Sequence, residues 1–381
     1  MTTDKAAWAR WAARRIHEAH GSVETPLVEF RLPSHLGIDM IFKDESAHPS
    51  GSLKHRLAAS LLMFGVCNGD IGPGTTLVDA SSGSTAVSEA YFARELGLAF
   101  VAVVPSGTSP SKLALIEEMG GAIEFVAEAG QARQTAERMG TGRGCVFLDQ
   151  FGNASVRTNW RSGNLASALF AQLQEEGYAE PDWIVVGAGT GGTSATIARF
   201  VRYTGRRTRV AVADPEGSAY HPSWLHQNRA QVGRASRIEG IGRPVVEASF
   251  IPQLIDEVIP VPDAWSVAAM RALRARGIEA GASTGTNLVG ALRIAEAMAH
   301  DGRSGLLASI ICDAAGRYEE TYFDDDWLAG QGIELGDAEA ALIRYLDGGP
   351  APAVIASGAS AKRSALVPHR SRSKSVAGAT H

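Results

Sequence analysis

The alternation of two kinds of segment constrains the fold of this chain more than any other feature of its sequence. From about residue 40 to about residue 312, short runs rich in β-branched residues alternate with segments of helical period, and turn residues separate them. Crossover helices of this kind connect parallel strands, so the pattern predicts an α/β fold with parallel sheets and flanking helices. Strands are expected at 40–43, 76–80, 99–104, 122–126, 146–149, 183–187, 209–213, 258–261 and 306–312. Helices are expected near 53–67, 85–96, 110–119, 130–139, 154–176, 192–204, 264–276 and 286–300.

The two ends of the chain differ from this middle part. Residues 1–21 carry Trp8, Trp11 and Ile16 at helical spacing, which predicts a helix that docks on the rest of the protein. The segment 350–381 is rich in Ser and Ala and poor in large apolar residues, so a disordered tail is expected there. Its charged residues are all basic, and a nucleic-acid or partner-binding arm is therefore the alternative.

Composition excludes several classes of function. The net charge of −5 gives no electrostatic reason to bind nucleic acid or an anionic membrane. No apolar run approaches the roughly 18 residues that a membrane span needs. The three cysteines, Cys67, Cys145 and Cys312, form no metal-binding spacing, and no HExxH motif occurs. We therefore expect a metal-free protein of a reducing, cytoplasmic compartment.

A glycine-rich turn follows the strand expected at 183–187. Residues 187–193 read Gly-Ala-Gly-Thr-Gly-Gly-Thr, and a helical pattern follows. Backbone N–H groups at a helix N-terminus bind anions, and glycines let a phosphate come close to the backbone. Gly187, Gly189 and Gly192 also satisfy GxGxxG, with Asp214 after the next strand. This stretch alone is compatible with a nucleotide-linked dehydrogenase.

Two further turns favour another chemistry. Lys54 begins a predicted helix after the turn 49–53, at the edge of the predicted sheet. A desolvated lysine beside the positive end of a helix dipole loses basicity, and its neutral amine can form a Schiff base. The segment 80–85, Ala-Ser-Ser-Gly-Ser-Thr, offers hydroxyl and N–H groups to a carboxylate. An imine-forming lysine, a carboxylate cradle and a phosphate cradle together fit an amino acid held on pyridoxal 5'-phosphate.

These segments resemble the cysteine synthase and cystathionine β-synthase family, pyridoxal-phosphate enzymes of fold type II, similar to the tryptophan synthase β-subunit. Further motifs agree in the family's order, and the resemblance covers roughly residues 23–330. They are found at 25–28, 148–153, 239–242 and 281–285. Within the family, the stretches 51–56, 81–91 and 237–244 are most similar to bacterial L-cysteine desulfhydrases.

The resemblance implies two open, twisted, mainly parallel sheets with flanking helices. The smaller α/β domain would comprise residues 45–153, and the larger one residues 1–44 with 154–345. The cofactor would lie between the two domains. The family also implies a homodimer that acts on a small amino acid, without nucleic-acid or membrane partners.

The resemblance also implies roles for individual residues. Lys54 matches the catalytic lysine that carries the cofactor, and Gln150 matches a second contact to the substrate carboxylate. The phosphate loop matches Gly189, Thr190, Gly191, Gly192 and Thr193. Further substrate contacts are expected at Ser81, Ser82, Gly83, Thr85 and Gly240.

This chain departs from the family pattern at two cofactor-binding positions. Ser84 stands where many members have Asn beside the phenolic oxygen of the cofactor. Ala314 is aligned with the Ser that faces the pyridine nitrogen, and strand alternation predicts that the neighbouring Asp313 points away.

The implied reaction is β-elimination from a β-substituted amino acid. With L-cysteine as substrate, an L-cysteine desulfhydrase would release sulfide, pyruvate and ammonia. A β-replacing synthase of the cysteine synthase or cystathionine β-synthase type shares every motif and is the alternative. A homologue used for binding or regulation is a third hypothesis, which rests on Ser84 and Ala314.

Overall fold

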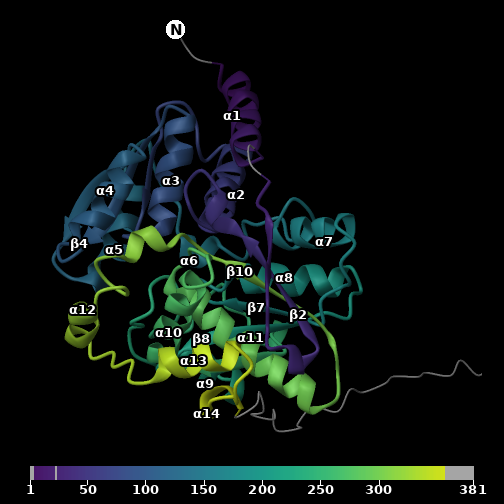
Figure 1. The fold of residues 1–381 in the computed structure, drawn as a ribbon. Helices are drawn as coiled ribbons and strands as arrows, with labels where there is room; N and C mark the ends of the chain where they lie inside the picture. Colours follow the sequence, from purple (N-terminus) through teal and green to yellow (C-terminus); the bar gives the residue numbers. More distant parts are fainter. Residues whose placement is uncertain (1–3, 22–23, 357–381) are drawn as a thin grey trace, which may run out of the picture.

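The computed structural model describes residues 4–21 and 24–356, which form an α/β fold with two mainly parallel sheets (Figure 1). The larger sheet has six strands in the order β1-β2-β10-β7-β8-β9. All of its neighbouring strands are parallel except β1 and β2. Its strands are β1 (Leu27–Phe30), β2 (Ile38–Asp44), β7 (Trp183–Gly187), β8 (Arg209–Pro215), β9 (Glu257–Val261) and β10 (Gly305–Ile311).

The smaller sheet has four parallel strands in the order β5-β4-β3-β6. They are β3 (Thr76–Asp79), β4 (Ala99–Pro105), β5 (Ala122–Val126) and β6 (Cys145–Phe147). The helices that pack on this sheet or on one another beside it are α1 (Lys5–His20), α2 (Lys54–Asn68), α3 (Ser84–Glu95), α4 (Pro110–Glu118) and α5 (Ala129–Gly140). We refer to the four-stranded sheet with α1 to α5 and the short helix α6 (Gln150–Asn153), which contacts α2, as the four-stranded region. The six-stranded sheet with α7 to α14 is the six-stranded region.

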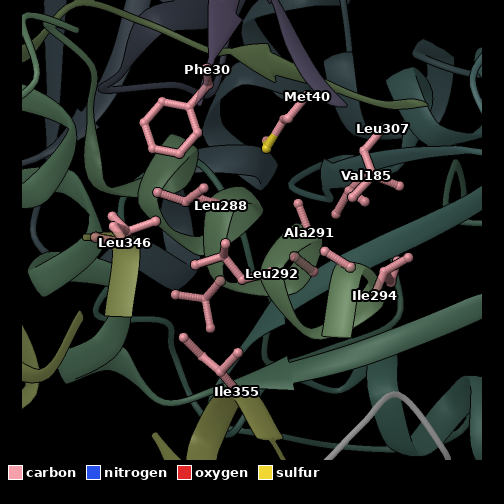
Figure 2. Close-up of a cluster of buried hydrophobic side chains, with 14 of the residues drawn as sticks. Phe30, Met40, Val185, Leu288, Ala291, Leu292, Ile294, Leu307, Leu346 and Ile355 are labelled. Carbon is pink, nitrogen blue, oxygen red and sulfur yellow. The ribbon is translucent and has the colours of Figure 1, made fainter. Parts of the chain in front are cut away.

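The six-stranded sheet is buried on both faces, which explains the near-continuous apolar runs of its strands. In β7, Val185 belongs to the hydrophobic cluster on one face, while Ile184 and Val186 belong to the cluster on the other face. Figure 2 shows Val185 and Leu307 of the sheet with Leu288, Ala291 and Leu292 of the long helix α11. The helices of this region are α7 (Leu165–Glu175), α8 (Gly192–Tyr203), α9 (Tyr220–His226), α10 (Asp263–Arg274), α11 (Ala282–His300), α12 (Asp325–Gly330), α13 (Ala338–Leu346) and α14 (Ala353–Ala356). Short 3-10 turns occur at Ser34–Leu36, Glu45–Ala47, Pro252–Leu254 and Ala315–Tyr318.

The predicted α/β alternation is confirmed, with differences at particular elements. All nine predicted strands form, and the short strand β1 was missed. The helix expected over 154–176 is shorter, because α7 begins at Leu165. Asn164 accepts a hydrogen bond from the Ser167 N–H and Ser167 bonds back to the Asn164 backbone, a capping box that fixes this start. Residues 154–164 form turns instead.

The predicted docking helix at the N-terminus is confirmed as α1. Its buried residues Ala12, Ile16 and Ala19 pack in the hydrophobic cluster of α2 and α3. The first helix therefore lies with the four-stranded region rather than with the larger sheet, where residues 1–44 had been placed. The reason is its apolar stripe, which needs the faces of α2 and α3 to be buried. The remaining domain boundaries, 45–153 and 154–345, stay a prediction.

The start of the predicted tail is ordered, contrary to expectation. Residues 350–356 include α14, whose Ile355 is fully buried against the cluster around α11 (Figure 2). A few apolar residues in a stretch of low complexity are enough to dock when an apolar surface lies beside them. The remainder of the tail, 357–381, lies outside the described residues.

None of the helices in the described part of the chain combines the length and the apolar character that crossing a bilayer requires.

Candidate active site

One cavity of about 930 Å³ lies where strands of both sheets end. Its wall contains residues from the loops that follow β3, β6, β7 and β10, because the carboxyl ends of parallel strands meet at one edge. The wall includes most of the residues singled out in the sequence: Lys54, Ser81, Ser82, Gly83, Ser84, Thr85, Gln150, Gly189, Thr190, Gly191, Thr193 and Gly240. Gly192 and Ala314 are not part of this wall.

Lys54, the first residue of α2, lies between the two sheets. Burial lowers the pKa of its amine, and nearby Cys312 and Asp313 offset part of that effect. The backbone before it is tied to the end of β10. The Leu53 N–H donates to the Cys312 carbonyl at 2.9 Å, and Ser52 pairs with Asp313 in an antiparallel bridge. The structure therefore fixes this lysine against the six-stranded sheet although its helix belongs to the other region.

The glycine-rich turn is a backbone anion site at the start of α8. Gly191 has φ +87°, a conformation that residues with a Cβ rarely adopt. A Cβ on Gly189 would lie 2.1 Å from the Gly240 carbonyl oxygen, and one on Gly191 would lie 2.4 Å from the Phe250 Cα. The first N–H groups of α8 and its helix dipole favour a phosphate here. Gly192 contributes to a second, smaller cavity, whose wall shares Lys54, Thr190 and Thr193 with the first.

The proposed carboxylate cradle joins two loops of the four-stranded region. Thr85 Oγ1 donates to Gln150 Oε1 at 2.6 Å, and Gln150 Nε2 donates to the Ala80 carbonyl at 3.4 Å. Ser81, Ser82 and Gly83 line the cavity beside this pair, just before α3 begins. Hydroxyl groups, an amide and the first N–H groups of α3 thus surround one place where a carboxylate could bind.

Arg317 supports the site without lining the cavity, and no sequence pattern indicated its role. Its Nη1 donates to Ser84 Oγ at 2.8 Å, and its Nη2 donates to the Ser50 carbonyl at 2.9 Å. Arg317 follows β10, whereas Ser50 precedes α2 and Ser84 is the first residue of α3. The guanidinium therefore ties the six-stranded region to both turns that carry the lysine and the cradle. The Ser84 hydroxyl, expected beside the phenolic oxygen of the cofactor, accepts this hydrogen bond from Arg317.

Asp313 and Ala314 differ in their contact with the cavity. Asp313 lines the cavity, Tyr318 Oη donates to its Oδ2 at 2.7 Å, and burial raises the pKa of Asp313 to about 6. Because β10 ends at Ile311, residues 312 and 313 both belong to the wall, whereas Ala314 does not. That the Asp313 side chain points away from the pyridine nitrogen, and that Ala314 faces it, stay predictions.

A serine does lie on this part of the wall, at the start of α11. Ser283 is 4% exposed and is in hydrogen-bond contact with the Cys312 thiol, whose pKa burial raises to about 11. Ser283 belongs to the motif 281–285, so the signal was present in the sequence. The resemblance gave Ser283 no role of its own, because it placed the partner of the pyridine nitrogen at Ala314.

An ion pair joins the two regions at the cavity wall. Lys112 Nζ of α4 lies 2.7 Å from Glu239 Oε2, in the loop 233–244, and both residues line the cavity. The Tyr322 hydroxyl accepts from the Glu239 N–H at 2.8 Å and donates to the Arg237 carbonyl at 2.8 Å. This loop is therefore held in place, and no sequence pattern indicated its ionic partner.

Asp214, the acid of the dinucleotide alternative, does not face the cavity. It is 1% exposed, and its Oδ2 accepts from the His221 N–H at 2.9 Å near the start of α9. A ribose-binding acid would have to face the glycine loop. The acidic residue that a dinucleotide-binding motif requires is therefore absent from the cavity wall.

Within residues 4–21 and 24–356, no cluster of three or more His, Cys, Asp or Glu side chains could hold a metal. The site instead fits pyridoxal phosphate: a buried amine with a lowered pKa lies in the same wall as an anion-binding loop. Neighbouring atoms leave no room for a Cβ at the glycines of that loop. A backbone without side chains lets a phosphate approach its N–H groups closely.

Comparisons with known proteins agree with this fit. The family model described as pyridoxal-phosphate dependent enzyme matches residues 19–312. An L-cysteine desulfhydrase of Mycobacterium tuberculosis is 47% identical over 347 residues, which are 89% of this chain and 94% of that protein.

More distant relatives are synthases. An N-(2-amino-2-carboxyethyl)-L-glutamate synthase of Cupriavidus metallidurans is 32% identical, over 80% of this chain and 89% of that protein. Among solved structures, an O-ureido-L-serine synthase matches with a TM-score of 0.70 and 27% identity, over 82% of this chain and 98% of that chain.

Proposed function

Because this chain belongs to the pyridoxal-phosphate dependent enzymes, we propose that it removes the β-substituent of L-cysteine and releases sulfide, pyruvate and ammonia. Its cofactor is pyridoxal phosphate, and it is a lyase or synthase of that family. The observation that carries the proposal is the convergence of Lys54, the phosphate loop and the carboxylate cradle on one cavity. The 47% identity to an L-cysteine desulfhydrase supports cysteine as the substrate.

Bound pyridoxal phosphate supplies an electron sink for bond breaking at the substrate Cα. The residues of the chain do the rest. Lys54 Nζ is the base for the Cα proton, and its lowered pKa leaves more of the amine free of a proton near neutral pH. The phosphate loop anchors the cofactor. The hydroxyl groups of 81–85 and Gln150 would orient the substrate carboxylate, and the Ser283 hydroxyl, on the wall beside Cys312, would offer the cofactor ring a neutral partner.

A β-replacing synthase is the second candidate. The synthase relatives favour it, and a cavity of about 930 Å³ offers room for a second substrate. The two candidates differ in the fate of the substrate after its β-substituent leaves: attack by water in one, attack by another nucleophile in the other.

Product analysis decides between them. We expect purified enzyme to release sulfide and pyruvate in equal amounts from L-cysteine with no added acceptor. Lys54→Ala is the matched control and should lose at least about 10³-fold in turnover, since general base catalysis alone contributes about 10²- to 10⁴-fold. Faster formation of cysteine from O-acetylserine and sulfide than breakdown of cysteine would favour the synthase.

The covalent role of Lys54 has its own test. Borohydride treatment followed by peptide mapping should place the cofactor on the peptide that contains Lys54. A label on another lysine would contradict the assignment.

We further propose a homodimer of the cytoplasm. The family resemblance supports the dimer, and sedimentation at several concentrations tests it. The cytoplasmic location is supported by Cys67, Cys145 and Cys312, which are free thiols in the structure. Fractionation of cells that express the tagged chain tests the location.

A further inference from the structure

Two buried acids lie under the carboxylate cradle, and the mechanism above does not use them. Asp79 ends β3 and Glu89 lies in α3, and each is 0% exposed. Their carboxyl groups are in hydrogen-bond contact with each other. The charged groups that face this pair are themselves acidic: Glu89 and Asp149 face Asp79, and Asp79 faces Glu89.

Asp79 holds together the two loops that form the cradle. Its Oδ1 accepts from the Ala80 N–H at 2.7 Å, and its Oδ2 accepts from the Gln150 N–H at 3.2 Å. Ala80 begins the loop that carries the cradle hydroxyls, and Gln150 lies 71 residues further along the chain from Asp79. One carboxylate thus sets the distance between the two halves of the cradle.

Glu89 must carry a proton for this arrangement to hold. Neither of its oxygens receives a hydrogen bond from the described part of the chain, although both are buried. Two carboxylates in contact can form a hydrogen bond only if one of them is protonated. Burial raises the pKa of Glu89 well above its ordinary value, and burial raises that of Asp79 to about 6. With the proton on Glu89, Asp79 stays charged and accepts hydrogen bonds from the Ala80 N–H, the Gln150 N–H and the Glu89 carboxyl group.

We propose that Glu89 is a positioning residue whose proton holds Asp79 in place and thereby sets the affinity of the cradle for the substrate carboxylate. This inference rests on the proposed function, because it takes an amino-acid carboxylate as the occupant of the cradle. The pair then places one negative charge beneath that carboxylate rather than two.

A dependence on pH follows. Above the ordinary glutamate pKa of 4.5, the folded protein keeps a proton that the unfolded chain has released. Stability therefore falls as pH rises, by up to about tenfold in the folding equilibrium per pH unit for one proton. When Glu89 ionises, a second buried charge faces Asp79, and carboxylate affinity falls as well.

Three variants of the holoenzyme test the proposal. Glu89→Leu removes the proton donor, whereas Glu89→Gln keeps a donor that does not titrate. Glu117→Gln makes the same chemical change at an exposed position of α4. The measurements are the dissociation constant of L-alanine, read from cofactor absorbance between pH 6 and 9, and the unfolding midpoint over the same range. The KM and kcat for L-cysteine complete the set.

We expect Glu89→Leu to raise the L-alanine dissociation constant and the KM by about tenfold, with kcat changed less than about threefold, as for one lost hydrogen bond. Glu89→Gln should stay near wild type at pH 6 and lose the decline in stability and affinity at higher pH. Glu117→Gln should keep that decline.

Identical pH profiles for wild type and Glu89→Gln would overturn the proposal, as would unchanged L-alanine binding in Glu89→Leu. If Glu89→Leu does not fold, the pH profiles of Glu89→Gln and Glu117→Gln still decide whether the proton of Glu89 is responsible. L-Alanine has no leaving group, so its binding does not depend on the reaction proposed. An enzyme that fails to degrade cysteine but shows these shifts would refute the function and keep the inference.

Discussion

The phosphate loop and the carboxylate cradle lie in one cavity but are built in different ways. The loop 189–193 belongs to the six-stranded region and binds through its backbone, and its glycines are needed because packing leaves no room for a Cβ. The cradle belongs to the four-stranded region and binds largely through side chains, which are held by Gln150 and by the buried acid Asp79. The backbone site tolerates little change in sequence. The side-chain site can be adjusted one hydrogen bond at a time.

The largest effect is expected from Gly191→Ala, which tests the backbone site. A residue with a Cβ in this conformation costs about 1–2 kcal/mol, and its Cβ would lie 2.4 Å from the Phe250 Cα. Strain and displacement of the loop together should weaken cofactor binding by at least about 100-fold. Gly130→Ala is the control, because nothing lies within 4 Å of a Cβ there. Cofactor absorbance after dialysis measures the difference, and equal retention in both variants would contradict a packing requirement.

Thr85→Val tests the side-chain site. Gln150 Oε1 would lose its buried donor, which costs about 1–3 kcal/mol, so KM for the amino acid should rise about 5- to 150-fold. Cofactor content should stay unchanged, in contrast to Gly191→Ala. Thr85→Ser keeps the hydroxyl and should recover most of the affinity. A loss of cofactor in Thr85→Val would show that the two sites are not separable.

Ser283→Ala should have a smaller effect and sharpens the assignment of the wall around Cys312. Loss of a neutral hydrogen bond of about 1 kcal/mol predicts about a fivefold fall in turnover and a shift in the cofactor absorption band. Ala314→Ser should change neither, because position 314 is not part of the wall. An effect of Ala314→Ser together with no effect of Ser283→Ala would show that position 314, not Ser283, faces the pyridine nitrogen.

Lys112→Gln should have the smallest effect. The pair with Glu239 joins the two regions, but its side chains are 37% and 26% exposed, and exposed pairs contribute about 0.2–1 kcal/mol. We expect at most about a threefold change in KM. The wild-type KM should become equally high in strong salt, where the ion pair is screened. A variant that stays sensitive to salt would show that another charge is responsible.

The residues that the sequence could place are those whose role depends on their immediate neighbours. Lys54 follows its turn, and the glycines at 189–192 lie between a strand and a helix, so local pattern was enough to find them. The short strand β1 and the helix α14 were missed because four residues give too little periodicity to detect.

The sequence by itself determined the α/β alternation, the lysine and the glycine-rich loop, because period, turn chemistry and glycine are local properties of a chain. Only the tertiary structure decided that Asp313 rather than Ala314 reaches the cavity, since the end of a strand depends on its partners in the sheet. It also decided that Arg317 holds Ser84, 233 residues away, and that Asp79 meets Glu89 in a buried contact. These contacts join residues that no periodicity relates, and burial gives them their strength, because a polar group without water must find its partner within the fold.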